Sequence, residues 1–426
     1  MLKHHLFRTT NSILTLIPLI TLFACQKESP VEPEIPVNEW LEPTENVSGT
    51  LADIQGIPLL TLWGTPYEMG YAHGYLYAPE LIEYAEIDLG QPGAVDNYEN
   101  LVLPNIHKYT IPEEYLQEME GLLHGIEARA GDSVYVAAID RYLTFDDIIA
   151  NFCSDNIETL LGTEGCTSFS AWDTATADGA PITAHNYEHP DNVINTGRYI
   201  LIVRKPTPGT GTLPWISVAL PGALHCDTGM NIEGVTLARQ QVDDPRPVSA
   251  TDGFCPEDLL YRKLLESARA ASVIDDVSAL LQELYTNGGE ALLMSWPSGH
   301  GDCSAVFEVD GDLTTGHGFT VRQPKTGSPF LIQTNQFYER LQPSHSNRYA
   351  LINARMTQIL DGRSTPLTFE KAWELLGEVP QGGNLLIQHA VVFEPDNMLM
   401  HVGFAEPGTH ATSGTRITVD VAALLD

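Results

Sequence analysis

Two strand-like segments joined by a tight turn lie near the middle of the sequence and constrain the fold more than any other feature. The first, GCTSFSAW, begins at Gly165 and alternates between two sets of side chains. The second is PITAHNYE, and the turn residues Asp178 and Gly179 lie between them. Period-two alternation on both sides of an Asp-Gly turn is typical of a β-hairpin. The sequence therefore predicts an antiparallel hairpin at this point.

Other segments can be assigned by their periodicity. Helices are expected where apolar residues recur at helical spacing after prolines or acids, and strands where short apolar runs end in turn residues. The expected helices cover residues 63–84 (with close-packed glycines Gly70 and Gly74), 111–132, 255–289 and 368–379. The expected strands cover residues 199–206, 215–222, 234–241, 291–297, 304–310, 317–324 and 329–337, with a last hairpin at 386–408. This order of elements suggests two sheets covered by helices on the outside.

The first 24 residues have the pattern of an export signal. A basic start at Lys3 and Arg8 precedes a short apolar run, residues 13–23. A membrane-spanning helix needs about 20 apolar residues, so this run is short for one. The sequence Leu22-Phe23-Ala24-Cys25 resembles a lipobox, in which the signal is cut before a cysteine that then carries lipid. We predict a signal peptide over 1–24 and a lipid on Cys25; an ordinary secretory signal and an uncleaved anchor are the alternatives.

Residues 25–50 are rich in proline and glutamate, a composition that cannot build a core and favours an extended chain. We predict that this stretch is a tether and that residues 51–426 form one compact domain. The expected location is the cell envelope, at the outer membrane or its periplasmic face, with the membrane contacted through the lipid on Cys25.

The charge of the chain excludes one class of partner. There are 22 Lys and Arg residues against 56 Asp and Glu, a net charge of −34. Nucleic-acid binding needs the opposite sign, so no nucleic-acid partner is expected. We predict neither a cofactor nor a resident metal, and the sequence does not indicate the oligomeric state.

Six cysteines are present, and in an exported chain they raise the question of disulfides. With Cys25 assigned to lipid and Cys166 considered separately, two disulfides in any of three pairings and buried free thiols both stay open. The four remaining cysteines are Cys153, Cys226, Cys255 and Cys303.

Cys166 itself has three interpretations. A cysteine within a strand is most often a small buried apolar residue. A second interpretation takes His185, Glu188 and His189, which match the H-x-x-E-H arrangement of inverted zinc peptidases. That chemistry needs both histidines on one face of a helix. Here the motif follows a hairpin turn and is followed at once by Pro190, which argues against a continuing helix.

The third interpretation makes Cys166 an N-terminal nucleophile. Its thiol can attack the Gly165–Cys166 peptide bond, and Gly165 provides the backbone freedom for a strained bond. Once released, the α-amine has an ordinary pKa near 7.7–8.0 and can accept a proton at neutral pH. One residue then supplies both the nucleophile and its base. The cut would leave two chains, 51–165 with the tether and 166–426.

The segments GCTSFSAWDTATADG and HNYE resemble the peptidase C45 family of N-terminal-nucleophile hydrolases, which includes isopenicillin N acyltransferase. Choloylglycine hydrolases, penicillin V acylases and acid ceramidase are more distantly similar. Further segments are similar to family landmarks in the expected order from about Gly64 to the end: GTPYEMGYAHG, GMNIEGVTLA, TNQFYE, SNRY and AVVFEPDNMLM.

The resemblance implies an α+β fold, a four-layer αββα sandwich, and cleavage of an amide carbon–nitrogen bond. It implies that Cys166 is the nucleophile, that Asn335 donates to the oxyanion, and that Asn231 is a second oxyanion contributor through its backbone. Arg348 matches the family's arginine near the nucleophile. A capped turn is the alternative role for Asn335, and a solvated helix arginine is the alternative for Arg348.

One motif departs from the family. Members commonly carry Arg-Asn-x-Asp where this chain has His185-Asn186-Tyr187-Glu188. Period-two alternation places Glu188 and His185 on opposite faces of a regular strand. We expect Glu188 to point at Cys166 and hold its α-amine or thiol, and His185 to be structural.

These observations predict a self-processing amidohydrolase that forms a thioester with a small amide or acyl substrate. Water as acceptor gives hydrolysis and an amine gives acyl transfer, and the acyl group itself is not indicated. A surface lipoprotein that only binds ligands and a zinc peptidase are the alternatives.

Overall fold

The computed structural model describes residues 36–158, 165–191, 196–242, 250–380, 382 and 385–426. The predicted signal peptide, Cys25 and most of the tether lie outside the described residues. Residues 37–426 form one compact unit. Within the described part of the chain, no helix is long and apolar enough to cross a membrane.

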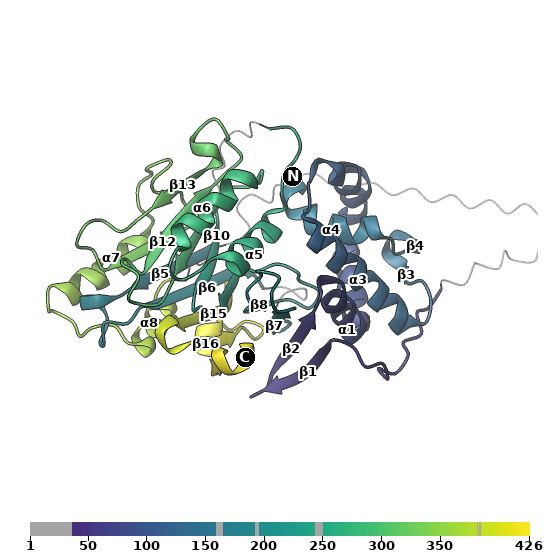
Figure 1. Cartoon of the computed structure of the whole chain (residues 1–426), viewed down its shortest axis with the longest axis horizontal. Coiled ribbons are helices and arrows are strands. Elements are labelled where there is room, and N and C mark those ends of the chain that lie inside the picture. The colour runs from purple at the N-terminus through teal and green to yellow at the C-terminus, as the bar shows by residue number, and fades with distance from the viewer. Residues whose placement is uncertain (1–35, 159–164, 192–195, 243–249, 381, 383–384) are drawn as a thin grey trace, which may run out of the picture. The chain divides into compact units, whose positions relative to one another are not determined.

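Two antiparallel sheets form the centre of this unit (Figure 1). The larger sheet has nine strands in the order β1-β2-β7-β8-β9-β10-β11-β12-β13, and only its β2–β7 pair is parallel. Its strands are β1 (Gly49–Ile54), β2 (Ile57–Gly64), β7 (Ile200–Pro206), β8 (Trp215–Ala219), β9 (Thr228–Asn231), β10 (Thr236–Gln241), β11 (Glu290–Ser295), β12 (Ser304–Val309) and β13 (Phe319–Arg322).

The smaller sheet has six strands in the order β14-β5-β6-β15-β16-β17. Its strands are β5 (Gly165–Ala171), β6 (Ile182–Pro190), β14 (Phe330–Thr334), β15 (Leu385–Glu394), β16 (Leu399–Phe404) and β17 (Arg416–Asp420). A separate two-stranded ribbon pairs β3 (Tyr135–Val136) with β4 (Arg141–Tyr142). The α-helices are α1 (Pro66–Leu89), α2 (Ala94–Asn97), α3 (Glu113–Ala130), α4 (Phe145–Glu158), α5 (Glu257–Ser267), α6 (Val273–Glu283), α7 (Asn347–Leu360), α8 (Phe369–Gly377) and α9 (Val421–Leu425).

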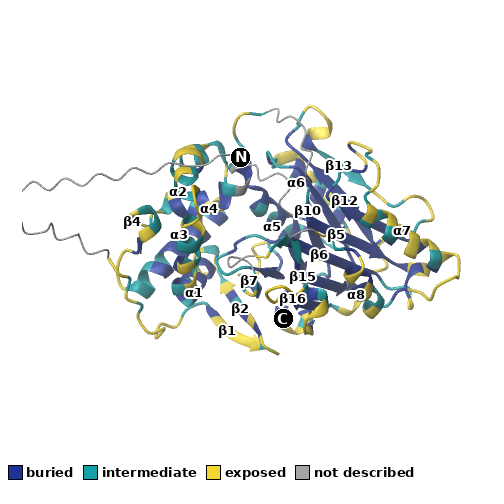
Figure 2. Cartoon of the chain, turned by 180° about the vertical axis from the view of Figure 1, so that it is seen from behind, coloured by how far each residue is buried: buried dark blue, intermediate teal, exposed yellow. Residues whose placement is uncertain are grey.

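The two sheets face each other and bury an apolar layer between them. Leu201 and Met230 from the large sheet pack with Val391 and Phe393 from the small one. Figure 2 shows that most residues of the central strands in both sheets are buried. A strand buried on both faces needs a cover on its outer side as well.

Helices provide that cover. On the large sheet, Leu264 of α5 and Val277 of α6 share a core with Phe307 of β12. On the small sheet, Ile352 of α7 and Leu376 of α8 share a separate core, which includes residues of β5, β6 and β15. The four-layer αββα sandwich expected from the sequence is therefore confirmed.

Helices α1 and α3 cross at unusually short range because glycines line the contact. A Cβ added to Gly70 would lie 1.9 Å from the carbonyl oxygen of Glu118, and one on Gly121 would lie 2.2 Å from that of Tyr67. Real Cβ atoms cannot approach so closely, so only glycine fits at these positions. The close-packed glycines expected in the first helix are confirmed.

The described end of the predicted tether is bound to the domain. The side-chain amide of Asn38 donates to the Tyr135 carbonyl (2.8 Å), and the Leu41 N–H donates to the Arg129 carbonyl (2.8 Å). Strand β1 begins at Gly49. The predicted boundary at residue 50 therefore falls inside a strand, and residues 38–48 are part of the folded unit. Hydrogen bonds to α3 and β3 outweigh the local preference for a solvated chain.

Most expected strands and helices are present, although the helical block expected over 255–289 is two helices, α5 and α6. The elements that were not predicted are the β1–β2 hairpin, the β3–β4 ribbon, strands β9 and β17, and helices α2, α4, α7 and α9. The central hairpin exists as β5–β6, with a longer loop than a two-residue turn. This loop runs from Trp172 to Pro181, and Gly179 within it has a φ of 84°.

A buried charge network joins the part of the chain before Gly165 to the part after it. Glu118 of α3 accepts hydrogen bonds from Arg204 Nε (3.2 Å) and Arg262 Nη2 (2.6 Å). Glu266 accepts from the Tyr115 hydroxyl (2.5 Å). Burial alone would raise the pKa of Glu118, but the two guanidinium charges outweigh it and hold the pKa below its ordinary value. The network ties the N-terminal helices to the sandwich.

Candidate active site

Cys166 lies at the start of β5, one residue into the strand, and is fully buried. Its backbone N–H donates to Oδ1 of Asn335 (2.9 Å), and its carbonyl oxygen accepts from Nη1 of Arg348 (2.6 Å). Both peptide groups that flank its Cα are therefore held by side chains from elsewhere in the chain. These contacts fix the backbone at the predicted processing site.

Asn335 follows directly after β14, the strand that pairs with β5. Its Oδ1 accepts a second hydrogen bond, from Arg348 Nη2 (2.8 Å), and its Nδ2 donates to the carbonyl of Gln241 (2.8 Å). An amide nitrogen carries two hydrogens, and among the described residues only Gln241 accepts one of them. The asparagine thus orients the Cys166 nitrogen and still has a donor for a second group.

Arg348 reaches the site from the first turn of α7. This helix begins after Ser346, whose side chain accepts from the Tyr349 N–H (3.2 Å). Besides Cys166 and Asn335, the guanidinium donates to the Thr167 hydroxyl (2.8 Å) and forms an ion pair with Glu188 (3.8 Å). The alternative of a solvated helix arginine is therefore wrong.

Glu188 occupies a different face from the one we expected. Residues directly opposite in an antiparallel pair have side chains on the same face. The register places Glu188 opposite Gly165 and Thr167 opposite Asn186, whereas Cys166 lies opposite Tyr187. The expectation that Glu188 shares the thiol's face is therefore wrong. Glu188 lies opposite Gly165, the residue before the predicted cut, and its carboxylate forms an ion pair with Arg348.

His185 shares the inward face with Cys166, opposite Ser168. Its Nδ1 lies 2.7 Å from the Ser168 hydroxyl, which also accepts from the side-chain amide of Gln240. Complete burial, aided by the charge of Arg239, lowers the pKa of His185 to about 3. The imidazole is therefore neutral at physiological pH and belongs to a polar contact between the sheets.

The strand geometry contradicts the zinc peptidase alternative. His185, Glu188 and His189 lie on β6, so His185 and Glu188 point to opposite faces instead of lining one side of a helix. Among the residues that the structure describes, no group of three or more His, Cys, Asp or Glu is arranged to hold a metal ion.

Asn231 ends β9 in the large sheet and closes a turn. Its side chain donates to the carbonyls of Leu265 (2.8 Å) and Ala268 (2.9 Å) and accepts from the Val235 N–H (3.1 Å). Its own N–H donates to the Val235 carbonyl (2.9 Å). Both the backbone and the side chain are thus engaged in the turn. The backbone N–H of Asn231 already has an acceptor in Val235, so the geometry does not support the expected role as an oxyanion donor.

Two residues of the site were missed by the sequence reasoning. Thr167 binds Arg348 through its hydroxyl, and Gln241 supplies the carbonyl that holds Asn335. Thr167 follows Cys166 directly and Gln241 lies at the polar end of a predicted strand, and these positions were only a weak signal. Among the described residues no disulfide is formed, and all five described cysteines are buried: Cys153, Cys166, Cys226, Cys255 and Cys303.

Comparisons with known proteins give limited matches. No known protein-family model matches this chain. An uncharacterised protein of Archaeoglobus fulgidus is 28% identical over 211 residues, which are 46% of this chain and 34% of that protein. The chain therefore matches about a third of the length of that relative.

Solved structures with a similar arrangement include three hydrolases or acylases of low sequence identity. The N-acylethanolamine-hydrolyzing acid amidase ortholog of Caenorhabditis elegans has 14% identity and a TM-score of 0.39, over 54% of this chain and 93% of that one. A mutant of the conjugated bile acid hydrolase of Clostridium perfringens has 12% identity and a TM-score of 0.44, over 61% and 94%. Penicillin V acylase of Agrobacterium tumefaciens has 14% identity and a TM-score of 0.37, over 56% and 83%.

Proposed function

We propose that this protein is a self-processing N-terminal-cysteine hydrolase that cleaves the carbon–nitrogen bond of an amide through a thioester. The observation that carries the proposal is a pair of side-chain hydrogen bonds to the backbone of Cys166. Asn335 accepts from its N–H, and Arg348 donates to its carbonyl oxygen. The backbone of a buried cysteine within a regular sheet would be bonded by neighbouring strands, whereas here two polar side chains bond it. The likeness of the same residues to the peptidase C45 family supports this assignment.

The first step in this proposal is a cut of the chain itself. The Cys166 thiol adds to the carbonyl carbon of Gly165, the bond from that carbon to the Cys166 nitrogen breaks, and the nitrogen takes up the thiol proton. Water then opens the thioester, which gives the Gly165 carboxylate and restores the thiol. Asn335 and Arg348 prevent rotation of the Cys166 backbone, so the thiol stays beside the bond it attacks.

The second step uses the new α-amine as a base. The amine takes the proton of the thiol, the sulfur adds to the carbonyl carbon of the substrate amide, and the leaving amine receives the proton. Water then hydrolyses the thioester and releases a carboxylic acid. Asn335 has one Nδ2 hydrogen that Gln241 does not use, and this hydrogen is the oxyanion donor in the proposal.

The two chains formed by the cut are expected to stay together. The segment before the cut contributes β1 and β2 to the nine-stranded sheet, and Glu118 pairs with Arg204 and Arg262 from the segment after it. Separating the two segments would also expose the apolar core that Met119 of α3 shares with Leu264 of α5, so dissociation is unfavourable. We also propose that a lipid on Cys25 anchors the complex; a Cys25→Ala variant should then leave the membrane fraction.

Intact-mass measurement of the purified protein tests the proposal. The wild type should give two chains that divide between Gly165 and Cys166, and Cys166→Ala should give one uncut chain with an unchanged far-UV spectrum. A panel of N-acyl p-nitroanilides should then leave an acyl group on the chain that begins at Cys166. Added hydroxylamine distinguishes the two acceptors, because acyl transfer gives a hydroxamate.

Two outcomes would contradict the proposal. A wild-type protein that is uncut and yet hydrolyses amides would remove the N-terminal nucleophile. A protein that is neither cut nor acylated, but binds ligands, would favour the surface-binding lipoprotein.

A further inference from the structure

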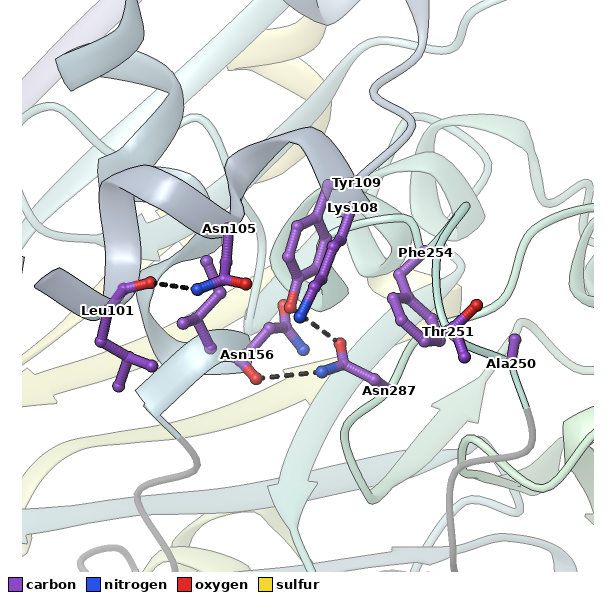
Figure 3. A pocket seen from close by; sticks show the side chains of 10 residues that line it. Leu101, Asn105, Lys108, Tyr109, Asn156, Ala250, Thr251, Phe254 and Asn287 are labelled. Carbon is purple, nitrogen blue, oxygen red and sulfur yellow. Dashed lines mark hydrogen bonds between the residues drawn. The ribbon is translucent and has the colours of Figure 1, made fainter.

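A cavity of about 510 Å³ is lined by residues from both segments of the chain, the one before the proposed cut and the one after it. Leu101 and Lys108 from the segment around the short helix η2 (Leu103–Lys108) and Ile157 from the end of α4 form one side. Phe254 and Asn287 form the other (Figure 3). A volume of this size accommodates a small organic molecule. Asn335, Arg348 and Glu188 do not line it, so this cavity is separate from the Cys166 centre.

The walls of the cavity are fixed by hydrogen bonds that cross it. The Tyr109 hydroxyl donates to Asn287 Oδ1 (3.1 Å), and Asn287 Nδ2 donates to the Asn156 carbonyl (3.0 Å). The Asn156 side chain in turn bonds both the N–H (2.9 Å) and the carboxylate (2.9 Å) of buried Glu257. A ligand would therefore meet a preformed surface, which lowers the entropy that binding costs.

Lys108 gives this cavity its charge. Its ten lining residues include no Asp or Glu, although acidic residues outnumber basic ones by 56 to 22 in the whole chain. The backbone carbonyl of Lys108 accepts from Gly253 (2.8 Å), which fixes the residue in place. Figure 3 shows its side chain running beside the Tyr109 ring with the amine toward Asn287. Within the described residues, no hydrogen bond or ion pair is found for this amine.

We infer that this cavity binds an amphipathic carboxylate, with the carboxylate on Lys108 and the apolar body against Leu101, Ile157 and Phe254. Among the described lining residues Lys108 is the cation and none is acidic, which favours an anion, and the apolar side chains select a hydrocarbon or aromatic body. The amides of Asn156 and Asn287 are engaged with the protein, so Lys108 provides the charge recognition. This inference concerns binding alone and does not depend on self-processing or amide cleavage.

Calorimetric titration with dodecanoate tests the inference, below the concentration at which this probe forms micelles. The protein is the uncut chain carrying Cys166→Ala, so that turnover cannot contribute. The solution holds 0.15 M salt, where charges more than about 8 Å away are screened and the net negative charge repels the probe less. Dodecylamine and dodecanol serve as probes of equal length with a cationic and a neutral head.

The expected result is saturable binding of one dodecanoate per protein, with weak or no binding of dodecylamine. Lys108→Met should weaken dodecanoate binding about tenfold, the effect of losing one charged hydrogen bond at a partly exposed site. Lys108→Arg should retain it. Lys325→Met removes an exposed lysine outside the cavity and should leave binding unchanged.

Three results would overturn the inference: no saturable binding of dodecanoate, equal binding by Lys108→Met, or equal affinity for the three head groups. The comparison of head groups uses the Cys166→Ala protein alone, so it decides the matter even if a lysine variant folds poorly.

Discussion

Asn335 gives the sharpest test of the proposed active site, because its two amide atoms have different tasks. Oδ1 holds the Cys166 nitrogen (2.9 Å), and Nδ2 donates to Gln241 (2.8 Å) with one hydrogen to spare. Asn335→Ala removes both tasks. Asn335→Asp keeps an oxygen that can hold the Cys166 nitrogen and pair with Arg348, but it removes every donor. The two variants together separate the positioning of the amine from the stabilisation of the oxyanion.

The magnitude follows from the number of donors lost. One oxyanion donor typically contributes about 10²–10³ in kcat, or about 2.7–4 kcal/mol of transition-state stabilisation. Both variants lose that donor, so both should lose at least this factor in kcat with little change in KM. Asn335→Ala also leaves the Cys166 N–H without its acceptor at a site where Asn335 is only 6% exposed. An unsatisfied buried group costs about 1–3 kcal/mol, so this variant should also be less stable.

The assay is steady-state hydrolysis of whichever N-acyl p-nitroanilide the wild type accepts, with thermal melting to measure stability. Gln336→Ala, the next residue along, serves as a control for local disturbance. A kcat within threefold of wild type in Asn335→Asp would refute the oxyanion role. A normal kcat in Asn335→Ala as well would reduce the residue to a structural support for β14.

Three further variants test the surrounding structure. Glu118→Gln should lower the free energy of unfolding by about 3–5 kcal/mol in urea, because it removes the carboxylate that pairs with buried Arg204 and leaves buried Arg262 paired with Glu266 alone. Since the pKa of Glu118 is held below its ordinary value of 4.5, this stabilisation is present above that pH and is lost as the pH falls through the folded-state pKa. His185→Gln should leave kcat and its pH profile above pH 5 nearly unchanged, because the imidazole is neutral with a pKa of about 3; a shifted profile would show that it titrates in catalysis. In the wild type, His185 binds a proton in the unfolded state but not in the folded state between about pH 6.5 and pH 3. The free energy of unfolding of the wild type therefore decreases as the pH falls through that range, and that of His185→Gln should decrease less. Glu188→Gln should slow the appearance of cut chains on a reducing gel, since Arg348 loses its ion pair beside Gly165; processing at the wild-type rate would contradict that role.

Local sequence patterns determined much of the fold and the identity of the central residue. The Gly165–Cys166 junction, the hairpin that contains it and the strands after residue 199 follow from period-two alternation and turn residues, which act over a few neighbours. The glycines of α1 likewise indicated a close helix contact before its partner was known. These features were readable because the forces behind them are local.

Only the tertiary structure decided which side chains meet at Cys166. Alternation shows that His185 and Glu188 lie on opposite faces, but the register with β5 decides which of them shares the thiol's face, and it placed Glu188 opposite Gly165. Arg348 reaches Cys166 from a helix 182 residues further along, through a contact that no periodicity encodes. Asn231 matches a family landmark in the sequence, but in the structure its side chain bonds Leu265 and Val235 in a turn. A local match to a motif therefore did not predict the contacts of this residue. Pairing between distant segments depends on the packing of the whole sandwich, so the residue types of the site were visible in the sequence and their geometry was not.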